Sequence, residues 1–297
     1  MNGTTVSDSV LDRLSASLDS LTPETRKAAT YVLEHPSEIS VASIRELATA
    51  AGVKPNSLMR MARAVGFKGF EDFRAPFRDD VRQGGLNFPD RARWLQSLGR
   101  GGGLSALYAD MAASAIQNIE DTFAATDEPR LRAAARTIVG ARRTYVLGVG
   151  VNNMNARNFC YLANMGMETV EPIPRTGSVP ADDLARAGPG DVLLAMTCKP
   201  YRSEVVDAVA LARSQGVDII AISDSPASPV LRSAAHGFVV AANTPQFFPS
   251  SISVIALLET LMAFVIADAP ADVVDAIDRL HARRHALGIY RDEPGDR

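Results

Sequence analysis

The stretch Ser43–Val65 reads SIRELATAAGVKPNSLMRMARAV, and it decides the fold of the N-terminal part of the chain. Ser43 and Glu46 have the spacing at which a serine and a glutamate cap the start of a helix reciprocally. This helix ends at Gly52, because glycine suits a tight turn. A second helix has Pro55 at its first position and runs to Val65. The stretch therefore predicts two short helices joined by a turn.

Small and apolar residues determine how these two helices cross. Ala48 lets the helices approach closely. The side chains that fill the seam between them are Val53, Leu58 and Met61. A preceding helix is predicted over residues 22–35, where Pro36 ends it. Three short helices in some 45 residues predict an all-helical bundle that contains a helix-turn-helix.

The segment Ser40–Arg78 is basic although the whole chain is acidic. It holds seven Lys and Arg against three Asp and Glu, a net charge of +4. The whole chain holds 31 against 34, a net charge of −3, so the remainder carries −7. A basic segment on an acidic chain indicates a polyanionic partner for that segment, and a helix with an outward polar face can read DNA in the major groove.

The polar residues of the second helix suit particular DNA contacts. Arg60 is the candidate for the edge of a guanine and Asn56 for an adenine, while Ser57 and Lys68 are candidates for phosphate contacts. The predicted DNA-binding residues are Ser43, Lys54, Asn56, Ser57, Arg60, Arg63 and Lys68. The alternative is a helical bundle with a solvated polar face.

The pattern changes after a glycine-rich stretch. We predict a linker over residues 83–104, between a helix-turn-helix domain at 1–82 and a second domain at 105–297. The second domain begins with a helix predicted over 105–126. The predicted strands are 144–148, 168–170, 191–196, 218–222 and 238–240, and the helices among and after them are 155–165, 203–215, 251–267 and 271–286. This alternation predicts a doubly wound α/β domain with a five-stranded parallel sheet.

Two loops follow strands at the edge where open parallel sheets bind ligands. The first begins Gly148-Val149-Gly150, but Asn153 stands where a dinucleotide-binding loop has its third glycine, which argues against a nucleotide. The second reads TCKPYR over residues 197–202. Its two cations favour an anion, either a phosphate or a carboxylate.

Three N-terminal motifs are LTP at residues 21–23, SIRELA at 43–48 and GFKGFEDF at 66–73. Together they resemble the RpiR family of bacterial transcription regulators, over about residues 21–77. The resemblance implies a DNA-binding domain. Lys54 departs from the family pattern, in which Ser or Thr usually caps the recognition helix. The lysine costs on the order of 1 kcal/mol of helix stability and adds a positive charge near the DNA.

The two loops and the segment ISDSP at 222–226 are similar to the sugar isomerase (SIS) domain, which this family carries and which recognises phosphosugars. The similarity covers about residues 116–267. Asn152 stands where SIS domains typically have Ser, and Lys199 and Arg202 replace hydroxyl residues of a Ser-x-Ser-Gly-x-Thr loop. The implied ligand-binding residues are Gly150, Asn152, Asn153, Thr197, Lys199, Tyr201, Arg202, Ser203 and Glu259.

Several of these residues have an alternative role. Lys199 and Arg202 could be solvated or pair with Glu204 or Asp207. Tyr201 either stacks on a sugar ring or covers the end of the sheet. Glu259 either contacts a ligand hydroxyl or stabilises the sheet.

Composition and pattern exclude several classes. The chain is 46% apolar and 22% charged, as globular proteins are. Its longest apolar run, about residues 253–267, is broken by Glu259 and falls short of the roughly 20 residues of a membrane span. No secretion signal is visible and only two cysteines are present, so we expect a cytoplasmic protein. His281 and His285 lack a third metal ligand nearby, so no metal or cofactor is predicted.

The sequence thus predicts a transcription regulator, not an enzyme, that binds double-stranded operator DNA and senses a small anionic metabolite, a sugar phosphate or sugar-derived acid. We expect a homodimer or homotetramer without membrane contact, with apolar helices around Ile116 and Leu257 as dimer faces. Two alternatives stay open: a SIS-type sugar-phosphate isomerase, and a regulator whose SIS domain is only a dimerisation scaffold.

Overall fold

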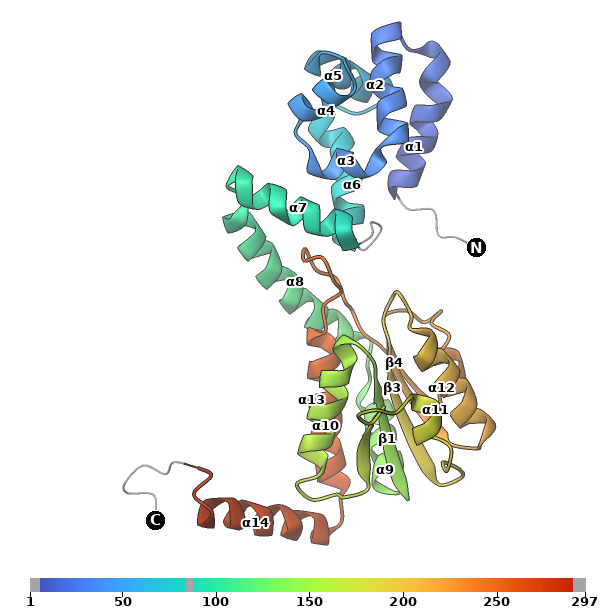
Figure 1. The fold of residues 1–297 in the computed structure, drawn as a ribbon, viewed down its shortest axis with the longest axis vertical. Coiled ribbons are helices and arrows are strands. Elements are labelled where there is room, and N and C mark those ends of the chain that lie inside the picture. The colour runs from blue at the N-terminus through green and yellow to red at the C-terminus, as the bar shows by residue number, and fades with distance from the viewer. Residues whose placement is uncertain (1–5, 84–87, 291–297) are drawn as a thin grey trace. The chain divides into compact units, whose positions relative to one another are not determined.

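The computed structural model describes residues 6–83 and 88–290. The chain forms two compact units, Met1–Ala115 with Asn243–Ser250, and Ile116–Ala242 with Ser251–Arg297. Figure 1 shows the elements of each unit.

The first unit begins as the predicted helical bundle. Its helices are α1 (Val6–Ser17), α2 (Pro23–Glu34), α3 (Pro36–Val41), α4 (Ile44–Ala50), α5 (Pro55–Ala64) and α6 (Phe70–Gln83), with a 3₁₀ turn at Leu18–Ser20. The three predicted helices are confirmed as α2, α4 and α5. Pro36 follows the end of α2 as predicted, but it also begins α3, because proline is tolerated at the first position of a helix.

The turn between α4 and α5 has the predicted chemistry. Ser43 Oγ accepts the Glu46 N–H at 3.2 Å, and Glu46 Oε2 accepts the Ser43 N–H at 2.7 Å. Gly52 has a φ of 62°, which residues with a side chain rarely adopt. Leu58 and Met61 are fully buried in the bundle core, so α5 is fixed by its apolar side and leaves its polar side exposed.

Two further helices follow the bundle, α7 (Phe88–Gly101) and α8 (Leu104–Ala124). α7 lies inside the stretch 83–104 that the sequence analysis assigns to a linker. Gly84 and Gly85 of that stretch lie outside the described residues, and the linker assignment stays a prediction.

The second unit contains the predicted five-stranded parallel sheet, in the order β2-β1-β3-β4-β5. The strands are β1 (Arg143–Gly148), β2 (Val170–Ile173), β3 (Asp191–Met196), β4 (Asp218–Ser223) and β5 (His236–Val239). The chain passes from β1 to β2 on one side and returns to β3 on the other. The direction of winding therefore reverses between β1 and β3, which is where such sheets bind ligands.

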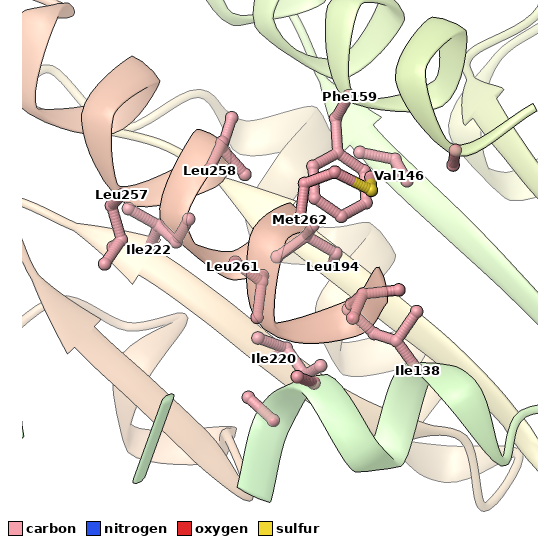
Figure 2. Close-up of a cluster of buried hydrophobic side chains, with 14 of the residues drawn as sticks. Ile138, Val146, Phe159, Leu194, Ile220, Ile222, Leu257, Leu258, Leu261 and Met262 are labelled. Carbon is pink, nitrogen blue, oxygen red and sulfur yellow. The ribbon is translucent and has the colours of Figure 1, made fainter. Parts of the chain in front are cut away.

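Helices cover both faces of the sheet. The helices α9 (Glu128–Val139), α10 (Val151–Ala163) and α13 (Ile252–Asp268) share one hydrophobic core with it, and α11 (Pro180–Asp183) and α12 (Ser203–Ser214) line the other. Figure 2 shows Leu257, Leu261 and Met262 of α13 among apolar side chains of the first core. Leu257 itself is fully buried, whereas Ile255 of the same helix is exposed, and the dimer face around this helix stays a prediction.

The C-terminal helix α14 (Ala271–Ala286) follows α13 after a sharp bend. Among the described residues no single helix is long and apolar enough to cross a membrane, and α13 and α14 pass that test only as a pair bent by 113°.

Candidate functional site

The exposed side of α5 and its N-cap carries four of the predicted DNA-binding residues: Lys54, Asn56, Arg60 and Arg63. Neither Lys54 nor Arg60 forms an ion pair with a residue that the structure describes. Unpaired cations on an exposed helix are available to phosphates and base edges. The structure thus brings these residues together on one surface.

Two of the predicted serines have their hydroxyl groups turned to the bundle itself. Ser57 is only 2% exposed, because it stands four residues before the buried Met61 on the inner side of α5. That helical spacing is visible in the sequence and should have placed Ser57 inside. Ser43 Oγ is engaged in the cap of α4. Lys68 is exposed, and its backbone N–H donates to Asp72 Oδ2 at 2.9 Å.

One basic residue of the segment serves the bundle instead of its surface. Arg74 is 5% exposed, and its Nε donates to Ile39 O at 2.6 Å. Its Nη1 contacts Glu71 at 3.1 Å, and burial lowers the pKa of the guanidinium. Arg78 also pairs with Glu71, at 3.1 Å. The charge that α5 can present to DNA is therefore smaller than the segment total of +4 suggests.

The loop after β1 lies at the point where the sheet reverses its winding. A side chain on Gly148 would place its first carbon 2.0 Å from Asn152 O, so only glycine fits there. Gly150 has a φ of 63° and forms the N-cap of α10 without a side-chain cap. The Asn153 N–H donates to Gly150 O at 3.1 Å. The N–H groups of Val151 and Asn152 are left for another acceptor, and such helix starts favour anions.

The predicted asparagines of this loop stabilise the turn itself. Asn152 is 8% exposed, and its Oδ1 accepts from Asn155 Nδ2 at 3.0 Å. Asn153 Nδ2 donates to Gly148 O at 3.2 Å, while its Oδ1 accepts from Arg157 Nε at 2.9 Å. The structure thus gives both amides protein partners.

The loop after β3 is joined to the end of β4. Ser223 Oγ donates to Thr197 O at 2.6 Å. The buried Thr197 Oγ1 accepts the Arg202 N–H at 3.4 Å, and Asp224 Oδ2 accepts the Lys199 N–H at 3.2 Å. These bonds fix the backbone of the loop and leave the Lys199 side chain exposed, without an ion pair to any described residue.

The other two large side chains of this loop have protein neighbours. Arg202 binds Glu204 with two hydrogen bonds, of 3.1 and 2.6 Å, as the alternative interpretation expects, and this pairing lowers the pKa of Glu204. Burial, with the nearby Asp224 carboxylate, raises the pKa of Tyr201. Both interpretations of Tyr201, stacking on a sugar ring or covering the end of the sheet, stay predictions.

The remaining predicted residues are accessible. Ser203 is the exposed first residue of α12, and Glu259 lies on the exposed side of α13.

Sequence reasoning missed an ordered carboxylate at the end of α11, the short helix that follows β2. Asp183 is 5% exposed and accepts bonds from Arg175 Nε at 2.8 Å, the Arg175 N–H at 2.8 Å and Ser178 Oγ at 3.0 Å. Burial raises its pKa, but these hydrogen bonds outweigh burial and the net shift is downward. No periodic or motif signal marks Asp183, because its partners lie in an irregular loop.

Two other features of the second unit do not add to this site. His281 and His285 have Nε2 atoms 3.1 Å apart, but the described residues hold no group of three or more potential metal ligands. Hollows of about 470 and 370 Å³ lie along α9, both lined by Glu128 and Arg132 among others, and none of the predicted ligand residues lines them.

Comparison with known proteins matches residues 8–84 to the helix-turn-helix domain of the rpiR family and residues 137–267 to the SIS domain. The chain belongs to the RpiR family. An HTH-type transcriptional regulator of Caldanaerobacter subterraneus subsp. tengcongensis is 23% identical over 269 residues, which cover 86% of this chain and 89% of that protein. This RpiR-family member is accordingly a transcription regulator with a helix-turn-helix and a SIS domain.

Solved structures agree with this assignment. The sugar isomerase domain of an RpiR transcription factor from Sphaerobacter thermophilus is 25% identical, with a TM-score of 0.55, and covers 59% of this RpiR-family chain and 98% of that one. The NanR protein of Vibrio vulnificus, complexed with ManNAc-6P, is 20% identical, with a TM-score of 0.56, over 94% of this chain and 99% of that one. The similarity to NanR shows that the two proteins share their fold over most of this chain.

Proposed function

We propose that this regulator reads operator DNA with α5 and that its SIS domain senses a small anionic metabolite, a sugar phosphate or a sugar-derived acid. The observation that carries the DNA-binding part is the exposed, unpaired Arg60 beside Asn56 on α5. Arginine recognises guanine with two hydrogen bonds and asparagine recognises adenine.

Arg60→Ala tests the DNA-binding role. Loss of one two-bond base contact costs about 1–3 kcal/mol, or about 5- to 150-fold in affinity. The measurement is a titration of the full chain with a duplex that the wild-type protein selects from a random pool. Arg186→Ala removes the same charge from an exposed position in the second unit. Equal affinity of Arg60→Ala and wild type would refute the assignment.

The effector part rests on the exposed Lys199 at the loop after β3, beside the uncapped start of α12. A cation together with free helix N–H groups favours a small anion. The uncapped start of α10 adds a second set of donors after β1. The complex of NanR with ManNAc-6P supports a phosphosugar as the first ligand to test.

A thermal-shift screen of the full chain tests this site. The screen compares sugar phosphates, beginning with ManNAc-6P, with sugar acids. Binding is detectable because a ligand at 100 times its dissociation constant adds about 2.7 kcal/mol of stability. Lys199→Ala should weaken the response, whereas Arg213→Ala, in the last turn of α12, should not. An unchanged response of Lys199→Ala would move the site elsewhere. A wild-type protein that binds operator and responds to no compound favours the scaffold alternative.

We further propose that the protein is not an enzyme. Burial raises the pKa of both thiols, Cys160 and Cys198, to about 12, so neither is a ready nucleophile. Turnover of aldose or ketose phosphates by the full chain would contradict this proposal and support the isomerase alternative.

We also propose that the regulator is a homo-oligomer that pairs through α8. Large apolar side chains stand exposed along this helix, with Tyr108 80% and Ile116 60% exposed. Pairing would place two recognition helices on one operator. Tyr108→Asp should shift the sedimentation mass of the full chain towards the monomer, and an unchanged oligomer would exclude this face.

A further inference from the structure

Residues 243–250, with the sequence NTPQFFPS, have an unusual place in the chain. They belong to the first compact unit, although the residues on both sides belong to the second. The segment follows β5 and precedes α13. Pro245 and Pro249 restrict its backbone, so the segment is stiff for its length.

Side chains hold this segment to α7. Arg91 Nη2 donates to Thr244 O, and the rings of Phe88 and Phe248 have centroids 4.7 Å apart. Thr244 is 4% exposed, and its Oγ1 contacts Met111 Sδ at 3.7 Å.

Arg91 is the unusual member of this contact. It is 3% exposed, and burial lowers the pKa of its guanidinium. No carboxylate of the described residues pairs with it, and its buried Nε has no partner among them. Burial of a cation without a counterion is unfavourable, so loss of the hydrogen bond to Thr244 O would strongly destabilise this contact.

Hydrogen bonds connect the start of the segment to the proposed effector loop. Ser223 Oγ donates to Thr197 O at 2.6 Å, and Ser223 O accepts the Val240 N–H at 2.8 Å. Thus a short series of bonded groups leads from Thr197 to Val240, three residues before the segment begins. The helix α7 also packs against α3 of the helical bundle.

We infer that residues 243–250 act as a strap that transmits effector binding to the DNA-binding bundle, through Arg91 and Phe88 of α7. The inference rests on the proposed function, since the strap needs an effector and a DNA-binding surface to connect. A change in the loop at 197–203 alters the end of β4 and the start of the strap. The strap then alters α7, which follows the bundle directly. Coupling of this kind is a free energy shared between two sites.

Amide hydrogen exchange of the full chain tests the strap without any effector. Phe248→Ala and Arg91→Ala each remove one contact between the strap and α7. We expect exchange to become about tenfold faster in α7 and also at residues 240–242 and the first turn of α13, beyond the strap. Phe247→Ala is the matched control, because Phe247 is the adjacent ring and is 45% exposed. Faster exchange confined to α7 and residues 243–250 would overturn the inference.

A second measurement uses ManNAc-6P as the probe and the selected DNA duplex as the reporter. Suppose that ManNAc-6P changes the DNA affinity of the wild type. In Phe248→Ala the ratio of the DNA affinity with ManNAc-6P to the DNA affinity without it should then lie within twofold of one. ManNAc-6P itself should still bind to this variant. An undiminished ratio in Phe248→Ala would refute the strap and leave the proposed function intact. If no metabolite alters DNA binding of the wild type, the proposed effector role fails, and the exchange measurement still decides the strap.

Discussion

Lys54→Ser should make the DNA-binding bundle more stable and DNA binding weaker. Lys54 is the N-cap of α5 and has the extended backbone of a capping residue, with φ −82° and ψ 149°, but its side chain makes no cap bond. Serine would supply an acceptor. Because the Ser57 N–H already donates to Lys54 O at 2.8 Å, chiefly the Asn56 N–H gains a partner. The increase in unfolding free energy should therefore lie in the lower part of the usual range, about 0.5–1 kcal/mol.

The same substitution removes one exposed cation from each recognition surface. Each phosphate contact contributes about 0.9 to the slope of log affinity against log salt. The slope should therefore fall by about 0.9 per bound α5. If the variant and the wild type bind equally at 1 M salt, this change in slope amounts to about a fivefold loss of DNA affinity at about 0.15 M salt.

Lys54→Ala is the matched control, since it removes the charge and adds no cap. Both variants should lose the same DNA affinity and salt slope in titrations at four salt concentrations. Only the serine variant should gain stability, by about 2–8 °C in the unfolding of the helical unit, for the expected change in free energy. An unaltered salt slope would show that Lys54 contacts no phosphate. A serine variant no more stable than the alanine variant would refute the capping argument.

Three further substitutions test the fold. Gly148→Ala should unfold the turn between β1 and α10 and lower the melting temperature, because the new carbon would lie 2.0 Å from Asn152 O. Gly188→Ala is the control in the same thermal melt and should be tolerated, because its new carbon meets no atom within 4 Å. Hydrogen bonds from Arg132 and Arg136 lower the pKa of Asp268 to about 2, so its stabilising effect is complete above about pH 4 and is lost as pH falls towards 2. Acid unfolding of Asp268→Asn should accordingly be less steep over that range. Ser43→Ala should lower the unfolding free energy of the bundle by about 1 kcal/mol in urea titrations, and no loss would mean that the observed cap contributes nothing.

Local signals explain why so much of the fold follows from the sequence. The Ser43 cap, the turn at Gly52 and the proline at the start of α5 each act over a few residues, so the sequence alone places them. The parallel sheet is equally visible, because its strands are buried on both faces and read as continuous apolar runs.

The candidate sites are less predictable, because side chains choose their partners in three dimensions. Arg74 and Arg91 are both basic residues, yet each is buried and donates to the backbone of a segment distant in the chain, at Ile39 O and Thr244 O respectively. Likewise Arg202 is the last residue of the loop predicted at 197–202, but its guanidinium is hydrogen-bonded to Glu204, two residues away. Residue type and spacing place this loop after β3, but they do not reveal which of its cations are already paired with carboxylates.

The pairing of Arg202 with Glu204 bears on which anion the proposed effector site would prefer. Lys199 is available as it stands, whereas Arg202 already has a carboxylate partner in Glu204. A ligand that recruits Arg202 must compete with this carboxylate. A sugar acid offers the same group and only one charge, so it gains little by exchange. A phosphate monoester carries about −1.5 to −2 charges at neutral pH and has three strong acceptor oxygens, so it can bind Lys199, Arg202 and helix N–H groups together. The charge arrangement of the loop therefore favours a sugar phosphate over the corresponding acid.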